Sequence, residues 1–461
     1  MAEEQPKAEV KKRKTATEAA SKISGMVKSA IGGTVKAKQE GKKLAYGFIA
    51  CSYDEIIRAM DTVPVWTENY AGICAVKRDV NRFLERAESL GFSRSLCTYA
   101  LVGLGFDHMR EELGEMPPNP PWGGQARPDV MLSSGQILCD PRNKWYQAAQ
   151  QFMPDVPIYN VGLPWPMYED DIDVADVADY YIKYIVTELR GLVKFLEDQT
   201  GKKMDYDRLS EIVALSERTW DLIWETYELR RAVPTPMDTG DAMNTMVPMA
   251  FMMGTREAYD FYFDLNRELK EKIARKEGVV TEEKYRLLWG GGLPSWFALT
   301  DFNYFNSKGA VFPAETTYRL VEPIDRLNMP NTNDPIERLA WRWLRYWTYW
   351  YDKAKKRPGS EPDVERLIQY IEDYQIDGIV MHEAFSCRTW HLGLIWQLNQ
   401  LKKIYRPIPI LKLGKKTTRE TPSLILESDI VDMSSYSEPE TRSKIDTFIE
   451  TLESLKAKQS A

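Results

Sequence analysis

The feature that most constrains the fold is an alternation of short apolar runs with stretches of helical periodicity. The apolar runs fall into two groups, one near each end of the chain. They lie at residues 44–50, 128–133, 156–161, 285–289, 309–312, 378–381 and 423–426. Strands separated by helices in this way are typical of parallel sheets covered on both faces. The sequence therefore predicts an α/β protein with two parallel-sheet domains of the flavodoxin or Rossmann kind.

The middle of the chain has a different pattern, which separates the two groups of strands. Apolar residues recur there at helical spacing, so helices are expected within 170–275. We therefore expect a basic flexible arm at 1–43, an N-terminal α/β domain at 44–168, a helical domain at 169–280 and a C-terminal α/β domain at 281–461. The arm has eleven Lys and Arg against five Asp and Glu and no aromatic residue, so we expect it to be mobile or ordered by a partner.

Composition excludes several classes of protein. No apolar run approaches the ~18 residues that cross a bilayer, and no secretory signal opens the chain. The formal net charge of −7 argues against broad binding of nucleic acid, which requires a basic surface. The five cysteines are scattered, which favours free thiols or metal ligands in a reducing compartment over disulfides. We therefore expect a cytoplasmic protein.

The segment HEAFSCRTWHLG at 382–393 contains Cys387 and two of the chain's three histidines. It directly follows the apolar run at 378–381, and Cys139 lies beyond the run at 128–133 in a comparable way. Ligands of open α/β sheets bind beyond the carboxyl ends of the strands, so both thiols are expected at such a crevice.

The alternative for any of the cysteines is the role of a small buried hydrophobic residue. That role suits Cys51 and Cys74, which have apolar neighbours, better than Cys97, Cys139 and Cys387, which lie among polar or charged residues. Spacing alone does not decide the matter, because no C-x-x-C pair sets a local metal geometry. Three thiolates would suit one cubane iron–sulfur cluster, which normally takes four Cys; one iron would then keep a position open for a substrate oxygen or another ligand.

Motifs of the common enzyme classes are missing from the sequence. It has no G-x-S-x-G elbow and no H-E-x-x-H zinc helix. The glycines at 290–292 are too few for a dinucleotide fingerprint, and the GKKTT stretch at 414–418 lacks two required positions of a phosphate loop. Any nucleotide-driven step is therefore expected on another chain.

A set of motifs, in order along the chain, resembles one known family. They are LCTY at 96–99, PDVMLS at 128–133, the Cys139 loop leading to Trp145, KYRL at 284–287, DGIV at 377–380, SC at 386–387 and ESDIVD at 427–432. Together they resemble the larger cluster-binding subunit of ATP-dependent benzoyl-CoA reductase, which belongs with the 2-hydroxyacyl-CoA dehydratases. The resemblance extends from residue 44 to the C-terminus.

The resemblance implies a [4Fe–4S] cluster held by Cys97, Cys139 and Cys387, with one iron open to an exogenous ligand. It also implies a smaller homologous cluster-binding subunit, an ATP-hydrolysing iron–sulfur activator and, indirectly, ferredoxin. Glu55 matches a family glutamate that would act in acid–base chemistry or positioning; a surface position on a helix is the alternative. Three features depart from the family: a longer Cys139 loop, a segment at 411–421 that looks inserted, and the basic arm.

The implied activity is reduction of benzoyl-CoA or a similar aromatic acyl-CoA to a dienoyl-CoA by single electrons, driven by ATP. Such chemistry needs a dry slot for the ring and a proton donor. The aromatic candidates for the slot are Trp289, Trp296, Phe297, Trp390 and Tyr304. His382 and His391 are the candidate proton donors, with a structural role as the alternative for each.

Two other interpretations stay open. The same scaffold would suit radical dehydration of a 2-hydroxyacyl-CoA, or an electron-relay subunit without its own substrate site. A helix at 341–350, rich in Trp and Tyr, is expected in a core or a subunit interface rather than at the substrate.

Overall fold

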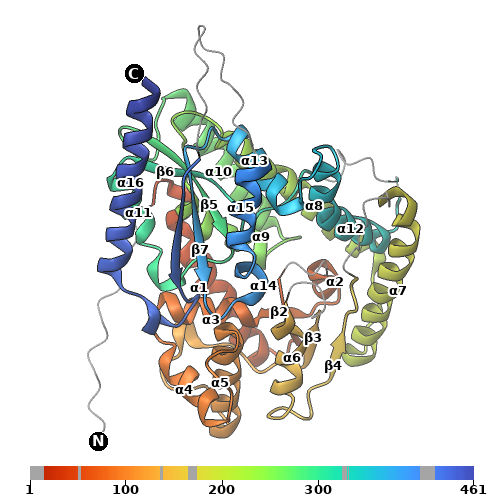
Figure 1. The fold of residues 1–461 in the computed structure, drawn as a ribbon. Coiled ribbons are helices and arrows are strands. Elements are labelled where there is room, and N and C mark those ends of the chain that lie inside the picture. Colours follow the sequence, from red (N-terminus) through yellow and green to blue (C-terminus); the bar gives the residue numbers. More distant parts are fainter. Residues whose placement is uncertain are drawn as a thin grey trace, which may run out of the picture.

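Two parallel sheets form the framework of the protein (Figure 1). The computed structural model describes residues 15–49, 53–134, 139–164, 174–323, 330, 332–404 and 421–460. Within these ranges, the strands of the N-terminal sheet are β1 (Leu44–Gly47), β2 (Val63–Trp66), β3 (Val130–Ser133) and β4 (Ile158–Asn160). Those of the C-terminal sheet are β5 (Tyr285–Gly291), β6 (Ala310–Glu315), β7 (Gly378–Ala384) and β8 (Ser423–Ser428).

The two sheets share one strand order. It is β2-β1-β3-β4 in the first and β6-β5-β7-β8 in the second, and every pair of neighbours is parallel. The two-parallel-sheet fold class is thereby confirmed, and the shared order supports the idea that the halves are related folds. In this order the chain first adds a strand on one side of β1 or β5 and then crosses to add strands on the other side. The switch points therefore lie between β1 and β3 and between β5 and β7, which are the positions where ligands of such sheets bind.

Strand β2 is the strand that the sequence analysis missed. Its sequence, VPVW, contains Pro64, which has no N–H to donate and weakens a strand prediction. β2 pairs only with β1 and forms an edge of its sheet. An edge strand tolerates proline because one of its sides has no partner to bond.

Helices cover the N-terminal sheet and pack closely on one another. They are α2 (Asp54–Ala59), α3 (Thr67–Val76), α4 (Asn81–Ser89), α5 (Thr98–Leu113) and α6 (Asp140–Ala149), with a 3₁₀ turn η1 (Pro121–Gly123). Two glycines permit the approach of α5 to its neighbours. A Cβ on Gly105 would stand 1.9 Å from the carbonyl oxygen of Phe83, and one on Gly103 would stand 2.1 Å from the Trp145 ring. α5 is therefore fixed in place on both sides.

The region between the sheets is helical, as predicted. It contains α7 (Val174–Thr200), α8 (Tyr206–Leu229), α9 (Thr239–Phe251) and α10 (Arg256–Ala274). Side-chain caps begin three of them: Asp205, Asp238 and Thr255 each accept a hydrogen bond from an N–H of the first turn. No helix in the described part of the chain is long and apolar enough to cross a membrane.

The C-terminal sheet has its own helices. They are α11 (Asp301–Ser307), α12 (Pro335–Ala354), α13 (Pro362–Asp373), α14 (Arg388–His391), α15 (Leu394–Ile404) and α16 (Glu438–Ser460), with 3₁₀ turns η2 (Trp296–Ala298) and η4 (Met433–Ser435). The Trp-rich helix is α12, which packs against α7, α8 and α13 at one side of the molecule (Figure 1). Trp341 and Trp343 are buried, so a core role for this helix is confirmed.

The segment expected to be a mobile arm contains a helix, α1 (Glu18–Gln39). Ile23 and Val27 on one face of it are buried in the core, while its lysines lie on the outer face. Asp241 of α9 accepts hydrogen bonds from the backbone N–H groups of Ala16 and Thr17. The prediction of a mobile arm is therefore wrong for residues 15–43; residues 1–14, Cys51 and residues 411–420 of the predicted insertion lie outside the described residues.

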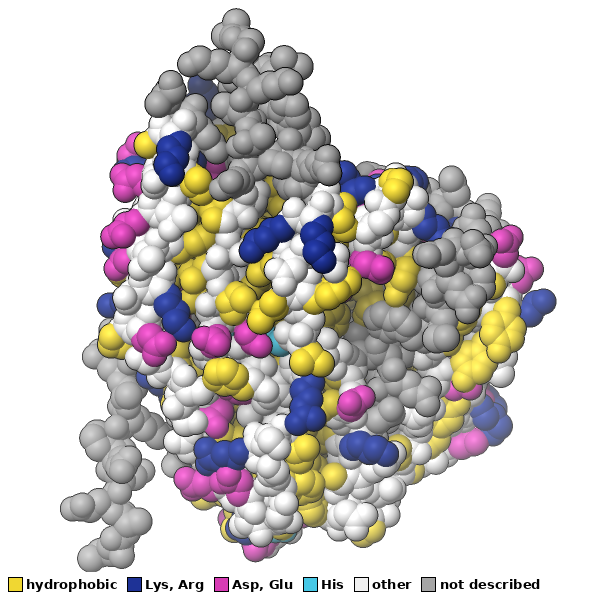
Figure 2. Space-filling view, viewed as in Figure 1, with side chains coloured by type: hydrophobic (Ala, Val, Ile, Leu, Met, Phe, Trp, Pro, Cys, Tyr) yellow, Lys and Arg dark blue, Asp and Glu magenta, His cyan; other side chains and the backbone are white. Residues whose placement is uncertain are grey.

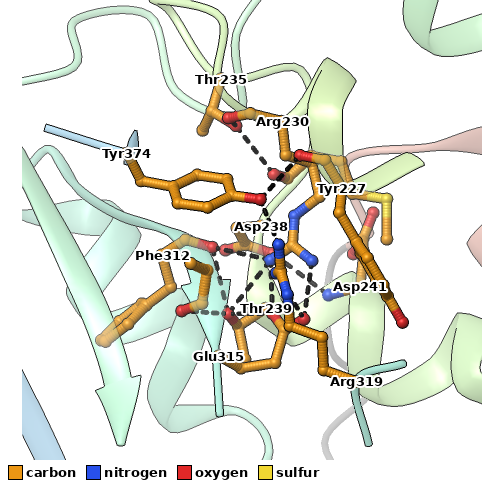
Figure 3. A network of polar contacts seen from close by, with 12 residues as sticks. Tyr227, Arg230, Thr235, Asp238, Thr239, Asp241, Phe312, Glu315, Arg319 and Tyr374 are labelled. Carbon is orange, nitrogen blue, oxygen red and sulfur yellow. Dashed lines mark hydrogen bonds and ion pairs between the residues drawn. The ribbon is translucent and has the colours of Figure 1, made fainter. Parts of the chain in front are cut away.

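A buried polar network joins the helical region to the C-terminal sheet (Figure 3). Arg230, at the end of α8, donates to both oxygens of Glu315, at 2.9 and 2.5 Å. Thr239, the first residue of α9, lies 2.7 Å from Glu315. A second arginine, Arg319, stands 3.6 Å from the same carboxylate and above the ring of Tyr227. Glu315 ends β6, so the network fixes the carboxyl end of that strand.

Candidate functional site

Three cysteines each stand directly before the first turn of a helix. Cys97 precedes α5, Cys139 precedes α6 and Cys387 precedes α14. Helix α6 follows β3, and α14 follows β7. Because β3 and β7 have equivalent positions in their sheets, Cys139 and Cys387 have equivalent positions in the two halves. The free N–H groups of a helix start favour negative charge, which suits thiolate ligands.

Electrostatic influences of one thiol on another indicate that the three thiols lie near one another. Burial raises the pKa of Cys97, and the nearby thiols of Cys139 and Cys387 raise it further. Burial raises the pKa of Cys387 to about 12, again with a contribution from Cys139, and it raises the pKa of Cys139. The structure thus brings together the three cysteines that the sequence analysis grouped. Cys74 lies apart, buried in α3.

The donor set fits a cluster better than a single ion. In the described ranges, no group of three or more His, Cys, Asp or Glu side chains is arranged to hold one metal ion. That finding concerns a single ion and does not bear on a cluster, whose ligands bind different irons. All three donors are sulfur, which is the ligand that iron–sulfur clusters take. Cys97, Cys139 and Cys387 therefore suit a cluster with each sulfur on a different iron.

A buried ion pair lies beside Cys139. Arg142, in the first turn of α6, bonds both oxygens of Glu68 on α3 and donates to the carbonyl of Ile49 at 3.1 Å. After burial, which raises the pKa of the Cys139 thiol, Arg142 is the main influence, and its positive charge lowers that pKa. Arg142 therefore favours the thiolate form that a metal requires.

A group of aromatic side chains, Tyr99, Trp296 and Tyr318, is linked to the cysteine segments through Tyr99, two residues after Cys97, and through the influence of Cys387 on Tyr318. The Trp296 indole donates to the Tyr99 hydroxyl, and its ring centroid lies 6.1 Å from that of Tyr318. Burial raises the pKa of Tyr318, and Glu68 and Cys387 act in the same direction, which places this hydroxyl near the thiols. Tyr318 has a left-handed backbone with φ of 51°, a conformation that costs free energy in a bulky residue and is found where surrounding structure imposes it.

The aromatic residues predicted for one slot divide between different places. Trp296 lies next to the thiol site, and Trp390 follows Cys387 in α14. Trp289 instead packs in the core against Phe302 and Phe312. Two others lie toward the C-terminal helix: Phe297 packs on Tyr436, and Tyr304 donates to Asp446 of α16 at 2.8 Å. The five residues do not form a single slot.

His382 has both ring nitrogens bound within the chain. Its Nδ1 lies 2.5 Å from the Leu293 carbonyl oxygen, so Nδ1 carries the ring proton and donates. Its Nε2 accepts from the Ser428 hydroxyl at 2.9 Å, and the Ser295 oxygen lies 3.1 Å from the same nitrogen. Burial lowers the pKa of His382 to about 4, so the ring is neutral at neutral pH. This geometry supports the structural alternative over proton donation.

Acid should therefore destabilise the protein through His382. The unfolded histidine takes up a proton near its ordinary pKa of 6.5, whereas the folded one stays neutral down to about 4. The unfolded state thus binds more protons in this window, and stability falls as pH is lowered. We expect a loss of about 2 kcal/mol from this residue between pH 7 and pH 5, measured by urea unfolding. A His382→Gln variant should show a correspondingly weaker pH dependence; an unchanged dependence would contradict the assignment.

His391 differs from His382 in having a ring nitrogen left over. Its Nδ1 lies 2.8 Å from the N–H of Ala384 and 2.6 Å from the His382 carbonyl oxygen. Its Nε2 is buried and has no hydrogen-bond partner among the described residues. A Cβ at Gly292 would stand 2.4 Å from this nitrogen, so glycine is required there. Of the two candidate proton donors, His391 is the one whose ring can still bind another group.

Glu55 lies inside the protein, so the surface alternative for it is wrong. Its two carboxylate oxygens accept from Nη1 and Nη2 of Arg342 on α12, at 2.6 and 2.9 Å. Burial acts to raise the pKa of Glu55, but the Arg342 guanidinium outweighs burial and lowers it. A carboxylate held ionised by two parallel hydrogen bonds is a poor proton donor. The geometry favours positioning, with Glu55 tying α2 to α12.

A family model described as HGD-D, the 2-hydroxyglutaryl-CoA dehydratase D-component, matches residues 51–452. This chain belongs to that family. The match covers strands β2 to β8, the helical region and the three cysteines Cys97, Cys139 and Cys387.

Individual members of the 2-hydroxyglutaryl-CoA dehydratase D-component family are distant in sequence. A benzoyl-CoA reductase subunit of Thauera aromatica is 24% identical over 426 residues, which is 90% of each chain. The (R)-phenyllactyl-CoA dehydratase alpha subunit of Clostridium sporogenes is 25% identical, covering 82% of this chain and 84% of its own. The (R)-2-hydroxyisocaproyl-CoA dehydratase alpha subunit of Clostridioides difficile is 27% identical over 60% of this chain and 66% of its own. The family thus contains subunits of both a reductase and dehydratases.

Three residues at the site, Glu68, Arg142 and Tyr318, were not named from the sequence. Thr98, Tyr99, Ser386 and Asp429 were named only as members of the LCTY, SC and ESDIVD motifs, with no role of their own. Glu68 and Tyr318 lie in segments with no strand or motif signal. Asp429 directly follows β8, so its place after the carboxyl end of a strand was a usable signal.

Proposed function

We propose that this chain is the iron–sulfur subunit of an aromatic acyl-CoA reductase, which reduces benzoyl-CoA or a close relative to a dienoyl-CoA by ATP-driven single-electron transfer. The observation that supports the proposal is the electrostatic influence of Cys139 and Cys387 on Cys97, together with the positions of Cys139 and Cys387 beyond the carboxyl ends of two equivalent strands. The choice of a reductase is supported by the relative from Thauera aromatica, which matches 90% of both chains.

In this proposal Cys97, Cys139 and Cys387 hold a [4Fe–4S] cluster. Bound there, the cluster would supply single electrons and, having three protein ligands, an open iron position for a substrate oxygen. Other residues of this chain would prepare the binding site for the cluster. Arg142 favours the thiolate of Cys139, while the buried rings of Tyr99 and Trp296 exclude water from one side.

The proposal includes partner proteins. Both full-length relatives are named as one subunit of an enzyme, and the sequence lacks a phosphate loop. We therefore assign ATP hydrolysis to a separate iron–sulfur activator, reduced indirectly by ferredoxin, and pair this chain with a smaller homologous subunit.

An exposed hydrophobic patch formed by Phe385, Leu392, Ile395 and Trp396 lies beside Cys387. Figure 2 shows hydrophobic side chains in the region of α14 and α15, in the middle of the face turned to the viewer. Exposed hydrophobic patches of this kind mark surfaces that bind other proteins.

Radical dehydration of a 2-hydroxyacyl-CoA is the second candidate function. It is favoured by relatives named as dehydratase alpha subunits, at 24% to 27% identity. The cysteine site and the need for an activator would be the same in both cases, so the thiol geometry does not separate them.

The deciding experiment supplies the anaerobic complex of this chain, its partner subunit and the activator with benzoyl-CoA or with phenyllactyl-CoA. A reductase consumes ATP and reductant in proportion to dienoyl-CoA formed and leaves phenyllactyl-CoA unchanged. Loss of water from phenyllactyl-CoA, with no turnover of benzoyl-CoA, would establish the dehydratase instead. If turnover occurs but neither substrate changes the electron paramagnetic resonance spectrum of this chain's cluster, the chain is a relay subunit.

A further inference from the structure

A buried carboxylate connects the chain segments that carry two of the three cysteines. Asp429 directly follows β8 and is 4% exposed. Its Oδ1 accepts from the Thr98 hydroxyl at 2.6 Å, and its Oδ2 accepts from the Ser386 N–H at 3.2 Å. Thr98 is the residue after Cys97, and Ser386 is the residue before Cys387. One side chain therefore bonds a neighbour of each of two proposed ligands.

The hydroxyl groups around Asp429 have a definite donor order. Thr98 Oγ1 lies 3.0 Å from Ser386 Oγ. A hydroxyl has one proton, and the short bond to the Asp429 carboxylate takes the proton of Thr98. Thr98 must then accept from Ser386, which gives a chain of bonds from Ser386 through Thr98 to Asp429.

Asp429 is itself fixed by its own loop. Its Oδ1 also accepts from the N–H groups of Val431 and Asp432, each at 3.1 Å. Its backbone carbonyl accepts from the Ser295 hydroxyl at 2.7 Å. The carboxylate is thus held from the C-terminal half while it reaches across to Thr98 in the N-terminal half.

We propose that Asp429 is a positioning residue that fixes the Cys97 and Cys387 segments at the spacing the bound group requires. It acts through Thr98 and Ser386 and does not touch the group itself. The effect on the metal rests on the proposed function, but the connection between the two halves does not. Partners behind metal ligands commonly change metal affinity by 10- to 100-fold when they are replaced.

An Asp429→Asn variant separates the two connections. The amide oxygen of asparagine can keep the bonds to Thr98, Val431 and Asp432, but its NH₂ group then meets the Ser386 N–H, donor against donor. A Thr98→Val variant removes the other connection by exchanging one hydroxyl for a methyl group. Asp432→Asn is the matched control: it lies in the same loop, and its side chain accepts from the Ser434 N–H and, at 3.4 Å, from Arg94, but from neither Thr98 nor Ser386.

Two measurements on the full chain test the proposal. In metal-free protein, hydrogen exchange at Ser386 should speed up by at least ~10-fold in Asp429→Asn, with exchange in β1 and β5 unchanged. In anaerobically loaded protein, both test variants should lose iron to a chelator ~10-fold faster than wild type. Asp432→Asn should match wild type in both measurements.

The outcomes distinguish this proposal from the proposed function. Unchanged exchange at Ser386, or unchanged iron loss from both variants of a chain that binds iron, would overturn the role of Asp429. Faster exchange in a chain that binds no iron even as wild type would uphold the connection between the halves and overturn the iron–sulfur function. Should Asp429→Asn fail to fold, the milder Thr98→Val variant carries the iron-loss test, and unchanged iron loss in it would overturn the role of Asp429.

Discussion

Single replacement of Cys97, Cys139 or Cys387 by serine will remove bound iron from the anaerobically purified chain and lower its activity at least ~100-fold. Serine matches cysteine in shape, so the fold should survive. Its oxygen is a hard ligand that stays protonated near neutral pH, whereas the cluster requires a soft thiolate. Because a cluster with only three protein ligands has no ligand to spare, losing one should cost the cluster as a whole. Iron and sulfide per chain, and the paramagnetic resonance spectrum of the reduced protein, measure the effect.

The matched control is Cys74→Ala. Cys74 is fully buried in α3, and burial and then Asp79 raise the pKa of its thiol; none of the three site cysteines is among the influences on it. Its loss should cost ~1–2 kcal/mol of stability through the small cavity it leaves, with full iron content. Normal iron in any of the three serine variants, or loss of iron in Cys74→Ala, would contradict the assignment of the site.

The strand ends were predictable because a parallel strand leaves a local signal. A short apolar run followed by a polar segment located β3 and β7 and, with them, the places of Cys139 and Cys387. Cys97 has no strand immediately before it, so its grouping with the other two depended on its polar neighbours and on the resemblance to a family. In the structure Cys97 stands directly before α5, just as Cys139 and Cys387 stand directly before α6 and α14.

The failed predictions concern contacts between residues distant in the sequence. The composition of residues 15–43 predicted mobility, but buried residues at helical spacing and the carboxylate of Asp241 hold α1 in place. Trp289 and Trp296 are close in sequence, yet one packs in the core and the other faces Tyr99. Aromatic content alone does not say which side of a strand end a ring will cover. Arg342 lies 287 residues from its partner Glu55, and Thr98 lies 331 residues from Asp429, so no local pattern could predict either contact.

Glu315→Gln should lower the free energy of unfolding by about 3–5 kcal/mol. Glu315 is the carboxylate at the centre of the buried network in Figure 3, where it faces Arg230 and Arg319. Glutamine keeps the shape but removes the negative charge, which leaves two buried guanidinium groups with no carboxylate between them. Burial acts to raise the pKa of Glu315, but Arg230 outweighs it and lowers the pKa, so the carboxylate is ionised throughout the neutral range. Urea unfolding at pH 7 measures the loss.

A surface pair supplies the control for the buried one. Lys194 and Asp198 lie 2.6 Å apart with both side chains more than half exposed, so Asp198→Asn should change stability by less than ~0.5 kcal/mol. Replacing both partners of the buried pair, as in Arg230→Met with Glu315→Leu, should recover much of the loss because no charge is then left alone. A small effect of Glu315→Gln, comparable with that of Asp198→Asn, would show that water reaches the network.

The pH dependence of the same variant tests the electrostatic cause. A carboxylate with a lowered folded pKa stabilises the protein above its ordinary value of 4.5, and this stabilisation is lost as pH falls through the folded value. The difference in unfolding free energy between wild type and Glu315→Gln should therefore be full at pH 7 and shrink in acid below pH 4.5.

The Glu315→Gln substitution should also affect the site of the three cysteines. Thr316 and Thr317, directly after Glu315, donate to the carbonyl oxygens of Gly291 and Gly292, and Tyr318 follows them. Loosening the end of β6 should free the left-handed Tyr318 from beside Cys387, so iron loss should accompany the fall in stability.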